Sequence, residues 1–262
     1  MLGRHSFRSL AEAQFSPWNR ERTAFAQHTP RQNHLLAALP PEDYDRLLPE
    51  LEPVSLPLGW TVQGASDRDK YLYFLTAGIV SLYQVMENGA SAEFAVAVSE
   101  DIIGVALFLG GDSTPSHAMV LSAGYAYRLR ARLLKNEFEH GGPLPHLLLR
   151  YTQALIAQTG QTAVCNRHHS VDQQLCRWLL LSLDRLTSNE LAMTQERIAS
   201  MLGVRREGVT EAAGHLQAAG LIHYSRGHIT VLDRPQLEKR VCECYAAVKR
   251  ETDRLLPDAI AH

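Results

Sequence analysis

The chain has 262 residues, 45% of them hydrophobic and 21% charged, which is typical of a soluble protein with room for two domains. Its formal net charge of −2 gives no overall indication of nucleic-acid binding, although a small basic domain can lie within a longer acidic chain. It has no run of about 18 apolar residues to span a membrane, no apolar secretory segment, and only four cysteines, too few for a disulfide framework. We therefore expect a cytoplasmic protein with no membrane segment.

The N-terminal part is polar and then helical. Residues 1–31 are rich in Arg, Gln and His and show no period, which predicts a mobile N-terminal arm. Between residues 33 and 51, apolar side chains recur at helical spacing on both sides of Pro40 and Pro41, and Asn33 is a candidate cap. This segment predicts one or two short helices.

Residues 53–130 alternate short apolar runs with turn residues. The runs predict strands at residues 54–56, 60–62, 71–75, 78–86, 92–98, 117–121 and 126–129. Gly78 and Gly124 are among the residues expected to separate them, and Asn88–Gly89 predicts a type I′ hairpin. Many short strands at even spacing favour a sandwich or barrel, and we expect a jelly-roll β-barrel.

A short helix is expected at residues 131–139, followed by a long helix that begins at Pro143, a favoured first helical residue. One apolar stripe on the long helix has coiled-coil spacing. It predicts a homodimer interface formed by Leu144, Leu148, Tyr151, Leu155, Gln158 and Thr162. A second stripe, Leu149, Ile156 and Ala163, lies beside it, so one stripe would contact a partner chain and the other the chain's own barrel. A helix buried within one subunit is the alternative.

A further helix at residues 171–186 leads into residues 193–232, the most informative segment. Thr194 is expected to cap a short helix, Gly203 to form a tight turn, and Gly220 to end a second helix. Alternating residues around Gly227 then predict a β-hairpin. Two short helices followed by a two-stranded wing form a winged helix-turn-helix. A last helix is expected from Arg234, with Pro235 near its start, and it closes at Leu256–Pro257.

The second helix of this motif carries charged and polar residues on its outer face. The major groove of B-DNA admits one helix, whose N-terminal residues reach the base edges. Arginine suits guanine, and glutamate accepts from the cytosine amino group. The outer residues therefore predict contacts with double-stranded DNA, with a solvated charged face as the alternative; they are Arg205, Arg206, Glu207, Thr210 and Glu211.

A jelly roll, a long dimerising helix and a C-terminal winged helix, in an α+β chain, together resemble the Crp/Fnr family of bacterial transcription regulators. The resemblance covers about residues 33–233 and is most specific at residues 194–209. It implies four parts: the arm at 1–31, a cyclic-nucleotide-binding-like sensor domain at 32–142, a dimerisation helix at 143–169 and a DNA-binding domain at 170–262. It also implies a homodimer on a near-palindromic operator, with RNA polymerase as a further partner.

By position, Arg206 and Glu207 match the family's base-reading residues. Thr194 and Gln195 match contacts to the DNA backbone, and Arg226 and His228 match phosphate contacts of the wing. The sequence departs from the pattern at two places, because Arg205 stands where a small capping residue is usual and Glu211 replaces a second base-reading arginine. The operator should therefore differ from that of the best-known member.

The ligand residues of the family are also changed. Gly104 is followed by Val105 instead of glutamate, and Ser116 stands near the position of the phosphate-binding arginine. A buried phosphate without these partners would be costly, so cyclic AMP is not expected and the small-molecule effector is unknown. His117 is either a substitute anchor or an ordinary residue of the core or of an edge strand.

Neither a metal nor a cofactor is expected. No cysteine precedes Cys165, which disfavours the family's N-terminal iron–sulfur cluster. Cys242 and Cys244 would face different ways on one helix, so binding a metal would require that helix to be locally broken, and structural roles are favoured. His168 and His169, near Cys165, have no second cysteine at zinc-ligand spacing.

The sequence leaves two alternatives to DNA binding. One is a ligand- or redox-sensing module whose helix-turn-helix contacts a protein, for which Glu211 is the best support. The other is a metal-dependent enzyme using the scattered histidines. The second is disfavoured because the sequence contains no H-E-x-x-H motif, no P-loop and no nucleophile elbow.

Overall fold

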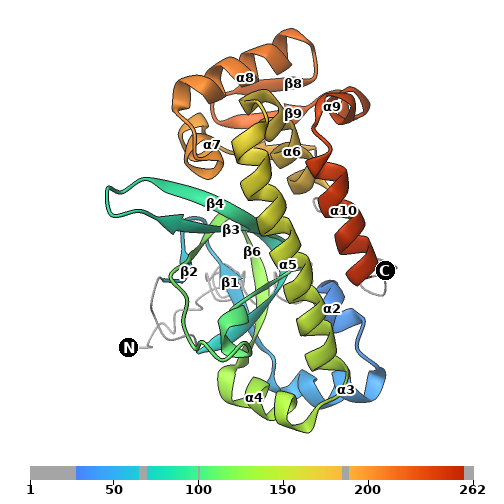
Figure 1. Cartoon of the computed structure of the whole chain (residues 1–262). Helices are drawn as coiled ribbons and strands as arrows, with labels where there is room; N and C mark the ends of the chain where they lie inside the picture. The colour runs from blue at the N-terminus through green and yellow to red at the C-terminus, as the bar shows by residue number, and fades with distance from the viewer. Residues whose placement is uncertain (1–27, 65–69, 100, 185–188, 257–262) are drawn as a thin grey trace, which may run out of the picture.

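An antiparallel sheet, a long helix beside it and a second, mainly helical unit make up the computed structural model, which describes residues 28–64, 70–99, 101–184 and 189–256 (Figure 1). Within these residues the first sheet has six strands, in the order β1–β6–β3–β4, with β2 paired to β6 and β5 to β3. The strands are β1 (Glu52–Leu56), β2 (Thr61–Gln63), β3 (Tyr71–Val85), β4 (Ser91–Ala97), β5 (Ile102–Ile103) and β6 (His117–Arg130). The sheet is jelly-roll-like but not the closed barrel that the sequence predicted.

Two glycines that were predicted to separate strands lie within strands instead, so these two predictions are wrong. Gly78 lies within the continuous strand β3, and Gly124 lies within β6, which pairs with β3 along nearly its whole length. A Cβ atom at Gly124 would lie 2.0 Å from the carbonyl oxygen of Ala77, and one at Gly78 would lie 2.7 Å from that of Ser122. Both glycines therefore allow the backbones of β3 and β6 to approach closely where their pairing is irregular, which is the other common role of glycine in a strand.

The predicted hairpin between β3 and β4 is present, but its turn is of a different type. Val85 pairs with Ser91, the amide of Met86 donates to the carbonyl of Ala90, and of the two turn residues only Gly89 has a positive φ, of +82°. A type I′ turn requires a positive φ at both Asn88 and Gly89. The hairpin instead has a three-residue loop with glycine at the left-handed position.

Short N-terminal helices close one end of the sheet: η2 (Pro30–Gln32), α2 (His34–Ala37), α3 (Pro41–Leu47) and η3 (Leu48–Glu50). Asn33 caps α2 as predicted, and its amide also donates to the carbonyls of Leu75 and Asp101. The arm predicted at residues 1–31 lies outside the described residues except for 28–31. That part is packed, since Pro30 is buried and the hydroxyl of Tyr127 donates to the carbonyl of His28 at 2.7 Å.

The helix α5 (Pro143–His168) begins at Pro143 as predicted, after η4 (Val105–Leu107) and α4 (Ala131–His140). Four of the six residues of the predicted dimer seam are buried within the single chain and so are not available to a partner. Leu144, Leu148 and Tyr151 are at most 4% exposed and pack in the chain's own core with residues of α2 and α3. Thr162 is also buried, and Leu155 and Gln158 are half-exposed.

The second stripe is the one that faces solvent. Leu149 is 48% exposed and Ile156 is 60% exposed, and Ala163 is exposed as well. Both stripes have coiled-coil spacing, and packing against distant parts of the chain, the N-terminal helices among them, decides which of them is buried. No helix in the described part of the chain is long and apolar enough to cross a membrane.

The C-terminal unit contains α6 (Val171–Leu183), β7 (Glu190–Ala192), α7 (Gln195–Leu202), α8 (Arg206–Ala218), β8 (Ile222–Ser225), β9 (His228–Val231), α9 (Arg234–Arg240) and α10 (Cys244–Leu255). Its core continues into that of the sheet through Ile79, Val98 and Leu121. The single helix predicted at the C-terminus is wrong, because residues 241–243 break it into α9 and α10. Figure 1 shows α10 running alongside α5.

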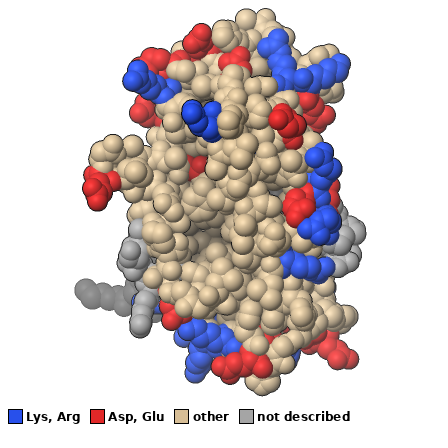
Figure 2. Space-filling model, viewed as in Figure 1, with Lys and Arg blue, Asp and Glu red and all other residues tan. Residues whose placement is uncertain are grey.

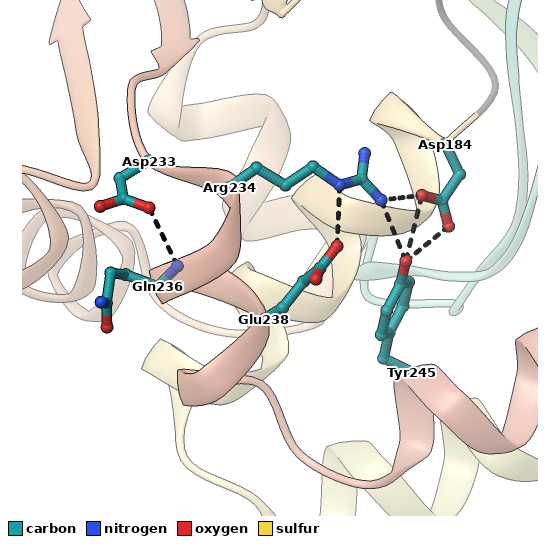
Figure 3. Close-up of polar contacts among 6 residues, drawn as sticks. All are labelled: Asp184, Asp233, Arg234, Gln236, Glu238 and Tyr245. Atoms are coloured by element: carbon teal, nitrogen blue, oxygen red, sulfur yellow. Dashed lines mark hydrogen bonds and ion pairs between the residues drawn. The ribbon is translucent and has the colours of Figure 1, made fainter.

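A polar cluster fixes α9 and α10 to the end of α6 (Figure 3). Arg234 forms an ion pair with Asp184, and its Nε donates to Glu238 at 2.8 Å. The hydroxyl of Tyr245 donates to Asp184 at 2.9 Å. Burial and the adjacent Asp184 carboxylate raise the pKa of Tyr245 to about 12. This cluster therefore joins the end of α6 to α9 and α10, close to the break between those two helices.

Candidate nucleic-acid interface

The two helices of the predicted motif have the expected local geometry. The hydroxyl of Thr194 accepts from the amide of Arg197, which caps α7. Gly203 has a φ of +67°, as the tight turn requires, and the amide of Val204 then donates to the carbonyl of Ala199 at 3.0 Å. Gly220 follows α8 with a φ of +72°. These predictions from the sequence are confirmed.

The helix α8 is fixed by its buried face. Val209, Ala212, Ala213 and Leu216 are at most 4% exposed, within the core of the C-terminal unit. The opposite face carries all five predicted contact residues at exposed positions, namely Arg205, Arg206, Glu207, Thr210 and Glu211. The expected loss of a cap is confirmed, since the side chain of Arg205 accepts no capping hydrogen bond.

The wing has a third strand. The strand β9 lies between β8 and β7, and β7 was missed because three residues give too little alternation to recognise. Arg226 and Gly227 form the turn between β8 and β9, with φ values of +50° and +81°. A positive φ at both residues is the mark of a type I′ turn. It holds Arg226 exposed at the tip of the wing.

An open groove of about 510 Å³ lies between α7, α8 and the wing. It unites Thr194, Gln195, Arg206 and Arg226 from the predicted set. The wall also includes Glu196 and Tyr224, which the sequence analysis did not single out. Tyr224 lies on the inward face of β8 with Ile222, so the alternation of the hairpin marks it as a core residue and gives no signal for the groove. Its hydroxyl donates to the carbonyl of Met193 at 3.0 Å, and burial raises its pKa.

The remaining predicted residues lie around this groove. The hydroxyl of Thr210 donates to Oε1 of Gln195 at 2.8 Å, which ties α8 to α7. Glu211 is the next residue of α8, and one of its carboxylate oxygens lies 4.0 Å from His215 Nε2. His228 is exposed beside the wing turn. Arg205 and Glu207 line a second open groove, which the β3–β4 hairpin borders with Gly89–Ser91.

The sheet contacts the helix-turn-helix directly through β4. A Cβ atom at Gly203 would lie 3.4 Å from that of Ala92, and a small cavity at this junction is lined by Glu93, Thr162, Arg177 and Met201, among others. Glu93 is buried, and Ser81 donates to it at 2.6 Å. Burial raises the pKa of Glu93 to about 8, opposed by the Ser81 hydrogen bond and the Arg177 charge.

This pKa predicts that stability falls with rising pH. Because the folded-state pKa of Glu93 lies above its ordinary value of 4.5, the folded chain holds the proton more tightly than the unfolded chain. The free energy of unfolding should therefore fall between pH 4.5 and pH 8, by on the order of 4 kcal/mol. Glu93→Gln should remove this loss. Urea unfolding at a series of pH values measures this dependence, and Glu87→Gln, at an exposed residue of the same hairpin, is the control. If the free energy of unfolding of Glu93→Gln falls with pH as steeply as that of the wild-type protein, Glu93 is not the group responsible.

The sheet domain contains the positions at which the sequence departs from a phosphate-binding pocket. Gly104 has a φ of +107° and leads into η4 at Val105. Ser116 forms a hydrogen bond with Thr114 at 3.2 Å. His117 pairs with Tyr83 across the strands, and the two rings stack with centroids 5.2 Å apart. His117 is therefore best interpreted as a strand residue rather than as an anchor for a ligand.

Comparison with known proteins finds two family models that match separate parts of the chain. The model described as a cyclic nucleotide-binding domain matches residues 53–140, and that described as a Crp-like helix-turn-helix domain matches residues 173–240. Together they span more than half of the chain. The first match contains most of the sheet, and the second contains α7, α8 and the wing.

Relatives and solved structures match over most of their own length. A global nitrogen regulator of Synechococcus elongatus is 23% identical over 192 residues, which are 70% of this chain and 86% of that protein. The fold is similar to FixK2 from Bradyrhizobium japonicum, with a TM-score of 0.63, 17% identity and coverage of 73% of this chain and 98% of that one. It is also similar to a putative crp/fnr regulator from Eubacterium rectale, with a TM-score of 0.64, 20% identity and coverage of 79% and 96%. From the two matched domains, in this order and with these relatives, we conclude that the chain belongs to the Crp/Fnr family of DNA-binding transcription regulators.

Proposed function

We propose that this regulator acts in the cytoplasm as a homodimer on a near-palindromic operator, with each α8 in the major groove of one half-site. The observation that carries the proposal is the groove that Thr194, Gln195, Arg206 and Arg226 line together, from α7, α8 and the wing. A two-fold axis would place the two copies of α8 about one duplex turn apart, roughly 34 Å, which is the spacing of two half-sites.

The contact residues fall into two classes. Arg206 and Glu207, at the start of α8, contact base edges, and Thr210 and Glu211 follow on the same exposed face. Arg205 and Arg226 contact phosphates, because both carry exposed guanidinium groups, Arg226 at the first groove and Arg205 at the second, and Arg206 lines both grooves. Thr194, Gln195 and His228 supply further contacts to the DNA backbone. If each subunit neutralises about three phosphates, the log–log salt slope of binding is about −5.

The exposed stripe on α5 supports the dimer. Leu149, Gln153, Ile156, Gly160 and Ala163 recur at alternating spacings of four and three and are all exposed in the single chain. Gly160 and Ala163 are small enough to let two helices approach closely. Figure 2 shows that the middle of this side of the molecule, over α5, carries few charged side chains. A pair of α5 helices would cover this stripe and supply the two-fold axis.

The base-reading role is tested by comparing two arginines of the same groove. Arg206→Ala should relax the base preference at one position of each half-site, with a loss of about 1–3 kcal/mol on the preferred sequence only. Arg226→Ala should weaken binding to all sequences alike and reduce the salt slope by about one unit per subunit. Selection of bound sites from random DNA, followed by binding at several salt concentrations, measures both effects.

Equal losses on all sequences for Arg206→Ala would contradict its base-reading role. Failure of the wild-type protein to select any site, repeated with candidate effectors, would contradict the proposal as a whole. A wild-type protein that binds without any salt dependence would contradict the phosphate contacts, because these release counterions.

A further inference from the structure

Four potential metal ligands from two distant parts of the sequence meet where the end of α5 lies near the break between α9 and α10. The ligand atoms of Cys165, His169, Cys242 and Cys244 all lie within 4.8 Å of one another. The two Sγ atoms of Cys165 and Cys242 are 3.6 Å apart, and Cys244 Sγ is 3.4 Å from His169 Nδ1. Tetrahedral zinc, with Zn–S of about 2.3 Å and Zn–N of about 2.0 Å, sets its ligand atoms roughly 3.5–3.8 Å apart. These pairs therefore already have the separation that one zinc ion requires.

The local structure explains how the cluster forms. Cys165 and His169 are four residues apart at the end of α5, so they lie on one face of that helix. Cys242 and Cys244 were expected to diverge, because residues two apart on a helix face different ways. The break between α9 and α10 removes that objection, since Cys242 lies in the break and Cys244 starts α10. The local break that metal binding would need is therefore present.

The surroundings favour a metal with thiolate ligands. The three cysteines are at most 3% exposed, in a small cluster separate from the main cores. His169 Nε2 is 3.4 Å from a carboxylate oxygen of Glu243, an arrangement that orients Nδ1 toward the cysteines. The Gln161 amide donates to Cys244 Sγ at 3.0 Å. The Arg177 guanidinium acts electrostatically on Cys165 and offsets the net charge of −1 of three thiolates with one Zn²⁺.

We propose that Cys165, His169, Cys242 and Cys244 bind one Zn²⁺ ion in a closed, tetrahedral Cys₃His site. Each thiol loses its proton to solvent as its sulfur binds, so one zinc ion displaces up to three protons. Thiolate and imidazole ligands at this spacing suit zinc, and four protein ligands leave no position for a substrate. The site is therefore structural.

The position of the ligands in the chain gives the ion a specific role. Two ligands precede Ser170 and two follow Val241, so the segment between them contains α6 to α9 with the whole DNA-contacting groove. The ion would link the end of α5, where the chain enters the DNA-binding unit, to the break between α9 and α10, where the chain leaves it. It would thereby fix that unit against α5, whether or not DNA is bound.

The first test is metal content. Elemental analysis of the full-length protein, purified without chelator from cells supplied with zinc, should find one zinc per chain. His169→Ala should lower this content at least about tenfold, because the loss of one of four ligands weakens binding strongly. His168→Ala is the matched control, because His168 is exposed and is not one of the four ligands. Cys176→Ala, at the fourth cysteine, should also retain zinc.

A second test does not depend on any variant folding. Wild-type protein stripped by a chelator and titrated with Co²⁺ should show the visible bands of a tetrahedral ion and the ultraviolet bands of cobalt–thiolate bonds. Removing zinc should lower the Tm by about 5 °C or more, since a ligand of the folded state stabilises it by mass action. Zinc binding weaker than about 1 µM, bound iron in place of zinc, a Cys165–Cys242 disulfide in the purified protein, or equal zinc content in His168→Ala and His169→Ala would each overturn the proposal.

Discussion

Ile156→Glu is expected to convert the dimer into monomers and to weaken operator binding at least about 100-fold, because a monomer binds only one half-site and a half-site contributes several kcal/mol. Ile156 is 60% exposed in the single chain and lies at the centre of the exposed stripe on α5. In a paired helix its side chain would be covered from both sides. A carboxylate there would be buried without a cation, which is strongly unfavourable.

The measurement combines analytical ultracentrifugation with DNA binding at one salt concentration. Leu58→Glu is the control, because Leu58 is 61% exposed and lies in the loop between β1 and β2, away from α5. This control should leave both mass and affinity unchanged. A dimer that survives Ile156→Glu, or a monomer that binds the full operator as tightly as the wild-type protein, would show that the subunits associate through another surface or do not need to associate.

The DNA-contacting unit was predictable because its signals are local. A cap at Thr194, a left-handed glycine at Gly203 and another at Gly220 each act within one turn of chain. The exposed face of α8 followed from the periodicity of its apolar residues. Such features depend on few residues outside the segment, so the sequence specifies them without knowledge of the remaining fold.

The choice between the two stripes on α5 was not predictable in the same way. Leu148 and Ile156 both recur at coiled-coil spacing, yet Leu148 is buried and Ile156 is exposed. Leu148 shares a core with Leu35 and Leu36 of α2, which are more than 100 residues away in sequence. The periodicity of a sequence indicates that a helix has an apolar face. Long-range packing decides whether that face is buried in the same chain or exposed.

The cysteine cluster is a second feature that depends on contacts which the local sequence does not reveal. The sequence argument about Cys242 and Cys244 was physically sound for an unbroken helix. It failed because Val241 ends the helical run and turns the chain, a change that the apolar pattern of residues 234–256 does not reveal. Cys165 is 77 residues away from Cys242, so a search confined to short spacings could not bring them together.

Glycines within strands were misinterpreted for a related reason. In sequence, Gly124 has the appearance of a turn residue because it interrupts an apolar run. In the fold it lies where the backbones of β6 and β3 approach closely, directly against the carbonyl of Ala77. Glycine is needed there because it has no side chain. A residue that only separates two strands could be alanine, whereas a residue at this close approach could not.

Gly124→Ala is therefore expected to destabilise the protein by about 3 kcal/mol or more, a large fraction of the stability of an ordinary domain. The added Cβ would lie 2.0 Å from the Ala77 carbonyl oxygen and 2.3 Å from its carbon. These are backbone atoms within the longest strand pair, so they can move aside only if β3 and β6 separate. Urea unfolding followed by circular dichroism measures the change.

Gly214→Ala is the matched control, because it makes the same chemical change with the opposite expected sign. Gly214 lies within α8, and a Cβ atom built there meets nothing within 4 Å. Alanine is a better helix former than glycine, so this variant should be more stable by about 0.5–1 kcal/mol. If Gly124→Ala is as stable as the wild-type protein while Gly214→Ala behaves as expected, the backbones of β3 and β6 do not approach as closely at Gly124 as described. The jelly-roll-like sheet would then accommodate a side chain between β3 and β6, and Gly124 would be no more than a residue of low strand propensity.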